Sequence, residues 1–285
     1  MGILEKKIDF AVILEVRNAN PNGDPLNGNR PRTDYDNYGE ITDVCIKRKI
    51  RDRLLENGHS IFVQSDDRKV DDAKSLRARA EAVLGDKLGS DETVALACKN
   101  WLDVRAFGQL FALKRKRNKK SKKQEAGNGG ADTGVSIGIR GPVTVQSAFS
   151  VEPIEVTSLQ ITKSVSGEDG GGKRASDTMG MKHRVDRGVY VTFGSMNPQL
   201  AEKTGFSDAD AENIKEALCE LFKNDESSAR PAGSMEVKWL FWWRHNSKAG
   251  QYPAAKVHRS LTVHPDGTFE LVNLDGLKPE IIEGS

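Results

Sequence analysis

The sequence predicts an α+β fold in which two amphipathic helices alternate with the strands of one sheet. A nearly continuous apolar run at 8–16 is rich in branched side chains, as buried strands are. Two segments, 44–58 and 207–225, place apolar residues one helical turn apart after capping residues, which is typical of amphipathic helices. Residues with the composition or alternation of strands fill four further segments, at 138–154, 156–165, 188–196 and 235–243.

The first half of the chain begins with a strand, a loop and a helix. The run IDFAVILEV at 8–16 is too short for a lone buried helix, so we expect a central strand buried on both faces. Proline, glycine and asparagine crowd residues 17–32, which favours a structured loop with tight turns. Thr42 and Asp43 then form a capping pair for a helix that should end near Gly58.

The second half repeats the pattern after an expected insertion that follows the first helix and contains helix-like patches near 72–84 and 91–102. Ser207 precedes an acidic first turn, which predicts the second helix. Alternating runs around Pro-Asp-Gly predict a hairpin at 260–272. The order of strand, helix, insertion, two strands, helix and strand is typical of a ferredoxin-like or RNA-recognition-type domain. Both helices would cover one sheet face and leave the other free to bind a polymer.

Composition excludes several classes of protein. The chain has 285 residues and a mean hydropathy of -0.56, and no stretch approaches the ~18 apolar residues of a membrane span. The N-terminus also lacks a secretory signal, so we expect a cytoplasmic protein with no membrane partner. Cys45, Cys98 and Cys219 are too far apart for a local metal or redox motif and are interpreted as buried or spare thiols.

Charge is distributed unevenly although the net charge is only +2. Residues 101–190 carry a net charge of +7, much of it in the run LKRKRNKKSKK, whose cations occupy 114–123. Such a run repels itself too strongly to pack, so it is expected to be an exposed loop or arm. A solvated linker and a phosphate-binding arm both remain open for it.

Tests for catalytic motifs are negative. The segment GEDGGGKR at 167–174 imitates a phosphate-binding loop, but Arg174 replaces the hydroxyl that would hold magnesium. The histidines lack zinc-site spacing and no nucleophile elbow occurs, so we expect no cofactor, no metal and no enzyme activity. Asp24 is the remaining acid of interest, because loop carboxylates can support metal-assisted RNA cleavage. An Asx turn beside Gly23 is the simpler interpretation.

Longer sequence blocks resemble a known family. In order, these are NPNGDP, NRPRTD, ITDVCIKRKIR, DVRAFGQLFA, GIRGPVTVQSAFSVEPI, QITKSV, DTMGMKHRVDRGVYVTFGSMNP and LAEKTGFSDADAE. They resemble the Cas-seven family of CRISPR backbone subunits, of the type I-C (Csd-two) kind. The resemblance implies one domain over 1–285, a modified RNA-recognition (RRM, ferredoxin-like) palm with a finger insertion at 58–135 and a thumb loop at 164–185.

The resemblance also implies a binding surface for the guide RNA (crRNA). Loop and turn residues would approach the RNA backbone closely, cations would neutralise phosphates, and two thumb methionines would wedge between bases. The implied residues are Asn20, Asn22, Gly23, Lys47, Arg48, Arg51, Arg105, Phe107, Gly108, Gln109, Arg140, Gly141, Gln146, Lys163, Met179, Met181, Lys182, His183 and Arg184.

The implied role is that of a non-catalytic scaffold in antiviral defence. Copies of the chain would polymerise along one crRNA and present it for pairing with a target DNA strand. Further implied partners are the Cas-five and Cas-eight type subunits that cap the RNA ends, and a small subunit. Two other functions remain open, namely a metal-dependent RNA-cleaving backbone subunit that uses Asp24 and a general single-strand chaperone without ordered assembly.

Overall fold

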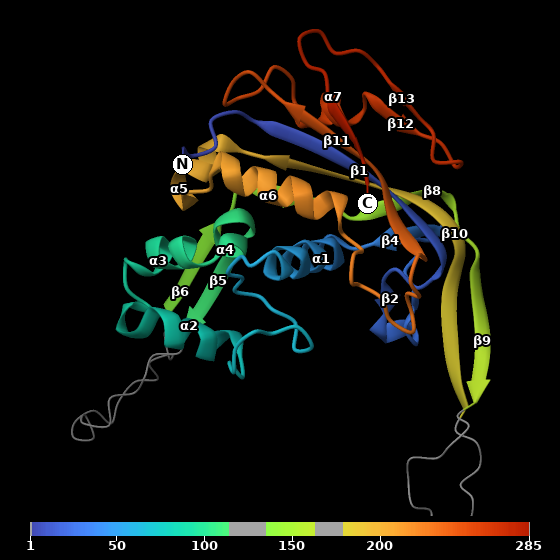
Figure 1. Ribbon diagram of the computed structural model, residues 1–285, viewed down its shortest axis with the longest axis horizontal. Helices are drawn as coiled ribbons and strands as arrows, with labels where there is room; N and C mark the ends of the chain where they lie inside the picture. The colour runs from blue at the N-terminus through green and yellow to red at the C-terminus, as the bar shows by residue number, and fades with distance from the viewer. Residues whose placement is uncertain (1, 114–134, 163–178, 285) are drawn as a thin grey trace, which may run out of the picture.

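The computed structural model describes residues 2–113, 135–162 and 179–284 (Figure 1). Three features of the sequence lie outside these ranges, namely the lysine-rich run from 114, the segment 167–174 and the predicted contact residue Lys163. Of the expected thumb at 164–185, only the part from Met179 onward is described.

A large antiparallel sheet forms the body of the molecule (Figure 1). Its central strand β1 (Ile8–Ala19) pairs with β10 (Met179–Met196) on one side and with β11 (Met235–Arg244) on the other. The first nine residues of β1 are buried, which confirms the predicted central strand. The remaining strands of the sheet are β4 (Tyr38–Ile41), β7 (Val143–Val145), β8 (Ala148–Pro153), β9 (Val156–Thr162) and β14 (Glu280–Glu283), in the order β14-β11-β1-β10-β8-β4 with β7 and β9 also paired to β10.

Two helices pack on one face of this sheet, as predicted. Helix α1 (Asp43–Glu56) is capped by Thr42, whose hydroxyl accepts a hydrogen bond from a backbone N–H of the first turn. Helix α6 (Asp208–Cys219) begins with a reciprocal capping box that Ser207 forms with Asp210. Their apolar sides join the alternate residues of β1 in the main core, and α5 (Pro198–Thr204) leads into α6.

The opposite face of the sheet is covered, so the expectation that it is free to bind a polymer was wrong. The C-terminal segment with α7 (Ala254–His258), β12 (Leu261–Val263) and β13 (Phe269–Leu271) lies across it (Figure 1, red). Apolar residues on both sides make this packing favourable, and they form a second core cluster of Ala11, Ile13, Val189, Phe241, Trp243, Val257, Leu261, Leu274 and Leu277. The predicted hairpin at 260–272 is confirmed.

An insertion after α1 forms a smaller unit with its own core. It contains α2 (Leu76–Leu84), α3 (Thr93–Asn100), α4 (Leu102–Phe107), and a hairpin of β5 (Gly108–Leu113) and β6 (Val135–Arg140). In its centre, the Phe62 ring packs in a tilted arrangement against the rings of Trp101 and Phe111. The 3-10 turn η2 (Gly85–Lys87) follows α2. The domain limits of 58–135 for a finger stay a prediction.

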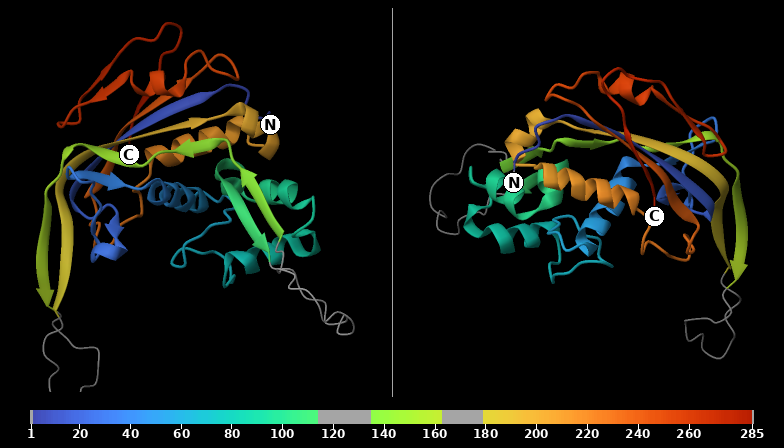
Figure 2. Two further views of the ribbon diagram at one scale, coloured as in Figure 1. Left: turned by 180° about the vertical axis from the view of Figure 1, so that it is seen from behind. Right: turned by 45° about the horizontal axis from the view of Figure 1, so that its top comes forward.

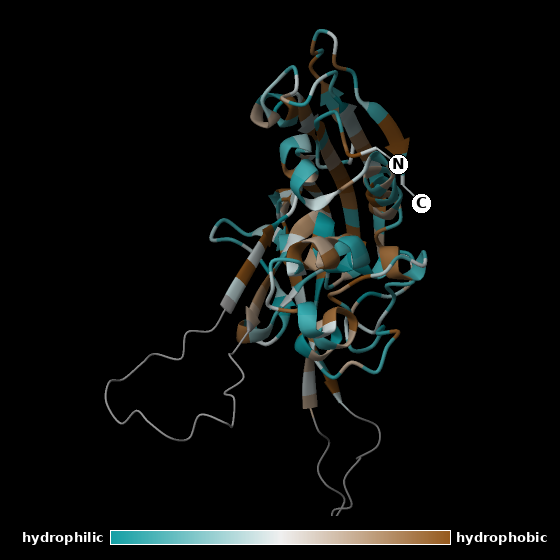
Figure 3. Cartoon of the chain, turned by 90° about the vertical axis from the view of Figure 1, so that its left-hand side faces the viewer, coloured by the Kyte–Doolittle hydropathy of each residue, from teal (hydrophilic) through white to brown (hydrophobic). Residues whose placement is uncertain are grey.

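A two-stranded ribbon projects from the sheet where β10 continues past the end of β1. Met179–Val185 of β10 pair with Val156–Thr162 of β9. The described part of the expected thumb loop, residues 179–185, is therefore strand. The short strands β2 (Gly23–Asp24) and β3 (Arg30–Pro31) flank the turn η1 (Pro25–Asn27). The β5–β6 hairpin and the ribbon project from the same side of the body, away from the C-terminal segment (Figure 3).

Candidate nucleic-acid interface

Most of the predicted contact residues lie on three elements, with α1 between the β5–β6 hairpin and the β9–β10 ribbon (Figure 2). The cation-bearing face of α1 is the outer one, since its apolar side packs on the sheet. The structure therefore places residues from distant parts of the sequence on one side of the molecule. Their individual contacts separate exposed groups from groups that hold the fold together.

The first loop is anchored by its own asparagines. The Asn22 side-chain oxygen accepts from both the backbone N–H and the hydroxyl of Thr42, each at 2.9 Å, and so ties the loop to the start of α1. The buried Asn20 amide donates to the Asn29 carbonyl oxygen at 2.6 Å. An added Cβ at Gly23 would lie 2.8 Å from the Asn29 side chain. These three predicted contact residues therefore shape the loop.

Cations along α1 are mostly engaged in ion pairs. Lys47 lies 3.0 Å from Asp43 one turn earlier, and the exposed Arg48 lies 3.4 Å from Asp67. Lys49 is buried against Asp225, and burial lowers its pKa although that carboxylate opposes the shift. Lys47 and Arg48 remain at the surface, where they can reach a phosphate.

Arg51 was expected to neutralise a phosphate, but the structure gives it a different setting. Its side chain is only 14% exposed, and its Nε lies 3.0 Å from the buried Asp103 carboxylate. The guanidinium also lies over the Phe107 ring, 5.0 Å from the centroid. Asp103 further accepts the backbone N–H groups of Phe62 and Val63, at 2.7 and 3.0 Å. Arg51 and Phe107 therefore join α1 to the insertion.

Two predicted glycines permit a close crossing of the chain beside the β5–β6 hairpin. A Cβ at Gly108, whose φ is +84°, would lie 2.2 Å from the Ile139 carbonyl oxygen, and one at Gly141 would lie 2.2 Å from the Ala106 carbonyl oxygen. No side chain fits there. Arg140 pairs with Gly108 in the strand register and is exposed, with no ion pair to any residue that the structure describes.

The two predicted glutamines are less constrained. Gln109 donates only to the neighbouring backbone carbonyl of Leu110, at 3.0 Å. Gln146 is exposed, and its backbone N–H donates to the Phe193 carbonyl oxygen at 2.8 Å. Neither side chain is held by a distant partner within the described part of the chain, so both stay open to a ligand.

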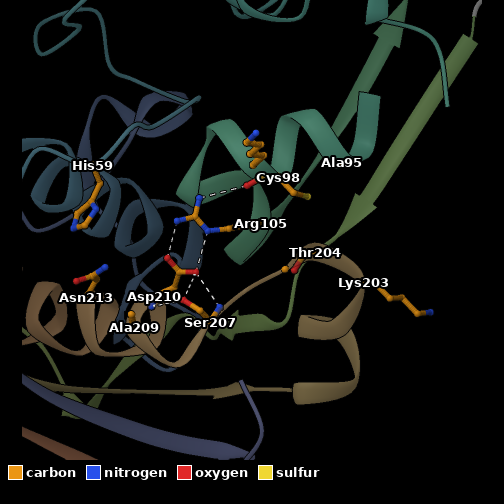
Figure 4. Close-up of a pocket in the computed structure, with 12 residues that line it drawn as sticks. His59, Ala95, Cys98, Arg105, Lys203, Thr204, Ser207, Ala209, Asp210 and Asn213 are labelled. Atoms are coloured by element: carbon orange, nitrogen blue, oxygen red, sulfur yellow. Dashed lines mark hydrogen bonds and ion pairs between the residues drawn. The ribbon is translucent and has the colours of Figure 1, made fainter. Parts of the chain in front are cut away.

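Arg105 lies in a groove between the insertion and the start of α6 (Figure 4). Its guanidinium makes a two-pronged contact with Asp210, at 2.7 and 3.0 Å. Burial opposes ionisation of Asp210, but hydrogen bonds from Arg105 and Ser207 hold the pKa of its carboxyl below the usual value. The groove encloses about 880 Å³, and His59, Lys99 and Lys203 also line it. Arg105 therefore joins the insertion to α6, and its contact with RNA stays a prediction.

The ribbon carries two strongly exposed predicted residues. Met179 and Met181 are 66% and 56% exposed and lie opposite Thr162 and Gln160 on one face. Leu159 and Ile161 are opposite Lys182 and Gly180 on the other face. Both faces of the ribbon thus expose apolar side chains.

Polar groups gather at the base of the ribbon. His183 Nδ1 is 2.8 Å from the Ser158 hydroxyl, which also accepts from Arg30 at 2.8 Å. Arg184 lies 3.3 Å from Asp186. Arg30 was missed by the sequence reasoning, although it stands in the matched segment NRPRTD and thus carried a local signal.

Asp24, the candidate for metal-assisted cleavage, is in a structural setting. Its Oδ1 accepts from the Leu26 N–H at 3.2 Å and lies 3.2 Å from Arg32, as the Asx-turn interpretation requires. Within residues 2–113, 135–162 and 179–284, no three His, Cys, Asp or Glu side chains are grouped as a metal site would need. None of the helices in these ranges is long and apolar enough to span a bilayer.

Comparison with known families supports the family that the sequence blocks resemble. The family model described as "CRISPR-associated protein Cas7" matches residues 6–275. A protein of Haloferax volcanii with the same description is 24% identical, over 96% of this chain and 80% of its own length. A chain in a solved structure titled "CRISPR RNA-guided surveillance complex, pre-nicking" is 14% identical, with 83% of this chain and 78% of that chain covered and a TM-score of 0.46.

A second solved structure, titled "Cryo-EM structure of the Type III-B Cmr-beta bound to cognate target RNA", contains a chain that is 12% identical. It covers 83% of this chain and 61% of that chain, with a TM-score of 0.42. The family model, by contrast, extends from the first residues of the body into the C-terminal segment. On that match, the chain belongs to the CRISPR-associated protein Cas7 family.

Proposed function

We propose that this chain is a non-catalytic, crRNA-binding backbone subunit of a type I-C CRISPR interference complex that acts in the cytoplasm. Copies polymerise along one guide RNA, with Cas-five and Cas-eight type subunits at its ends and a small subunit alongside, and present the guide to a target DNA strand. Family membership supports the general role, and the sequence blocks support the subtype. The strand order β11-β1-β10-β8, with α1 and α6 on one face, supports an RRM-like palm.

The observation that carries the proposal is the pair of exposed methionines on the ribbon. Met179 and Met181 belong to neither core cluster of the sheet and are 66% and 56% exposed. Exposed apolar side chains on a projecting element mark a contact surface, and flexible methionines can insert between stacked bases. His183, next to them, could then contact the adjacent backbone.

Purified complexes test this function. The chain is co-expressed with a repeat-spacer array and the neighbouring subunits, and the bound nucleic acid is examined on a denaturing gel. A discrete RNA of guide length in a large particle supports the backbone function, whereas heterogeneous RNA would support the chaperone and overturn it. Cleavage of target RNA with added metal, abolished by Asp24→Ala, would instead support the enzyme.

A mismatch profile tests the role of the ribbon. The wild-type complex should tolerate target mismatches at regularly spaced guide positions, where a ribbon displaces a base. The double variant Met179→Ala and Met181→Ala should weaken this periodic tolerance, while Leu159→Ala on the opposite face serves as the matched control. An equal penalty at every position in the wild-type complex would contradict base displacement.

A further inference from the structure

Three cations surround one buried carboxylate on the face of the sheet that carries the C-terminal segment. Glu15 of β1 has a side chain only 4% exposed, whereas those of Arg17 and Arg187 are 58% and 55% exposed. Arg17 Nη2 lies 2.7 Å and Arg187 Nε 3.2 Å from the same Glu15 oxygen, Oε1. Lys238 Nζ lies 3.7 Å from the other oxygen. We call these four residues the Glu15 cluster.

The cluster lies on the opposite side of the sheet from α1. Glu15 pairs with Val189 in the register of β1 and β10, and Val189 belongs to the core under the C-terminal segment. The members come from three adjacent strands, β1, β10 and β11, at the end of the sheet near the ribbon (Figure 1). A ligand held here would therefore not follow the path across α1.

Positive charge exceeds negative charge in the cluster. Burial opposes ionisation of Glu15, but hydrogen bonds from Arg17 and Arg187 lower its pKa, so the carboxylate is charged at neutral pH. The Glu15 carboxylate offers one negative charge to three cations. Among the described residues, only Lys238 has a second carboxylate nearby, since its Nζ lies 3.4 Å from Glu236 Oε1. At least one positive charge stays uncompensated by the residues that the structure describes.

The two arginines are also placed directly opposite each other in the strand register. Like charges in this position destabilise a sheet, and Glu15 offsets the repulsion by accepting from both on one oxygen. Each guanidinium has five N–H donors, of which Glu15 uses only a few. The remaining donors on two exposed, fixed arginines match the oxygens of a phosphate.

The surroundings favour a nucleic acid over a protein surface as the ligand. Protein interfaces have an apolar, aromatic-rich centre. The strand segments around the cluster, 15–19, 185–189 and 235–239, contain no exposed large apolar side chain. A charged, polar surface without an apolar centre is typical of contacts to a phosphate backbone.

We propose that the Glu15 cluster binds the phosphate backbone of a second nucleic-acid strand, distinct from the guide. The proposal rests on the proposed function only in that the guide occupies the α1 side. Arg17 and Arg187 grip the phosphate, Glu15 orients both side chains, and Lys238 adds charge from the neighbouring strand. Each subunit would then carry one such site on the face of its sheet that bears the C-terminal segment.

Salt-dependent binding tests this site. Complexes carrying their guide RNA are titrated with a labelled single-stranded DNA that lacks complementarity to the guide, between 50 and 500 mM salt. Removal of two phosphate contacts in Arg17→Gln/Arg187→Gln should reduce the slope of log affinity against log salt by about 1.4. Over a tenfold rise in salt, the wild type should then weaken about 25-fold more than the variant.

Two controls make the result specific. The variant Arg17→Lys/Arg187→Lys keeps the charge and should keep most of the salt slope. The variant Arg244→Gln removes an exposed arginine that pairs with Asp208 at the other end of β11, and it should leave the slope unchanged. An unaltered slope in the double Gln variant would overturn the proposal. If that variant also lost a protein subunit from the complex, the cluster would be a protein contact.

The same experiment separates this inference from the proposed function. Guide length and content are measured in each preparation before titration. If the wild-type complex holds no discrete guide, the backbone function fails, yet a slope difference between wild-type and variant protein would still support a phosphate site. If the guide is intact and the slopes agree, the function stands and the Glu15 cluster has no such role.

Discussion

Gly141→Ala should destabilise the protein although it adds a single methyl group. The new Cβ would lie 2.2 Å from the Ala106 carbonyl oxygen and 2.6 Å from both the Ala106 carbonyl carbon and the Gly108 nitrogen. All three are backbone atoms at the junction of α4 and β5, so no side chain can rotate away. Overpacking of this kind lowers the free energy of unfolding by about 1–3 kcal/mol. Since each kcal/mol shifts the midpoint of thermal unfolding by about 2–4 °C, the midpoint should fall by roughly 2–12 °C.

The matched control is Gly138→Ala in the same hairpin. Its added Cβ would have only a Leu110 methyl group nearby, at 3.9 Å, so its midpoint should stay close to that of the wild type. Thermal unfolding followed by circular dichroism compares the two. Equal midpoints for both variants would refute the reasoning, and loss of RNA binding by Gly141→Ala at an unchanged midpoint would point to direct contact with RNA.

Three further outcomes follow from the buried charges and thiols. Arg51→Gln leaves the buried Asp103 without its cation and should lower the free energy of unfolding by about 3–5 kcal/mol. Arg48→Gln, at an exposed position, should change it by no more than about 0.5 kcal/mol. Urea titration measures both values, and similar losses would contradict the pairing. The lowered pKa of the Asp210 carboxyl stabilises the folded protein at pH values above the usual pKa of 3.8, and this stability is lost as the pH falls through the folded-state pKa. The free energy of unfolding of Asp210→Asn should therefore fall less steeply with decreasing pH than that of the wild type. Identical pH profiles would exclude this contribution. Burial raises the pKa of the Cys98 thiol to about 11, so Cys98 should be alkylated far more slowly at pH 8 in the folded protein than in denaturant. Mass spectrometry measures both rates, and equal rates would contradict the burial of this thiol.

Features that depend on neighbouring residues in the sequence could be predicted. The apolar run of β1 and the caps at Thr42 and Ser207 are local signals, and the structure contains the elements that they predict. The hairpin of β12 and β13 likewise follows from its turn residues. Where that hairpin packs is a long-range property, and for this reason its position over the sheet was not anticipated.

The candidate interface was harder to predict because charges do not reveal their partners. Arg51 pairs with Asp103, 52 residues away, and Arg105 pairs with Asp210, 105 residues away. In the sequence these arginines resemble any exposed cation. Of the ribbon, β9 falls within the segment 156–165 that was predicted to be a strand, whereas the paired part of β10 was missed. Both faces of the ribbon are largely exposed, so residues 179–187 lack the apolar alternation that marks a half-buried strand.

The continuity of β10 has a consequence for how the ribbon can change in length. Opposed residues in an antiparallel pair share a face, and successive residues alternate between faces. Adding one residue to each strand at the base would carry Met179 and Met181 to the face that now bears Leu159 and Ile161. Two added residues would restore the original face and extend the ribbon by about 7 Å. Related proteins that keep the methionines on the same face can therefore differ in ribbon length only in steps of that size.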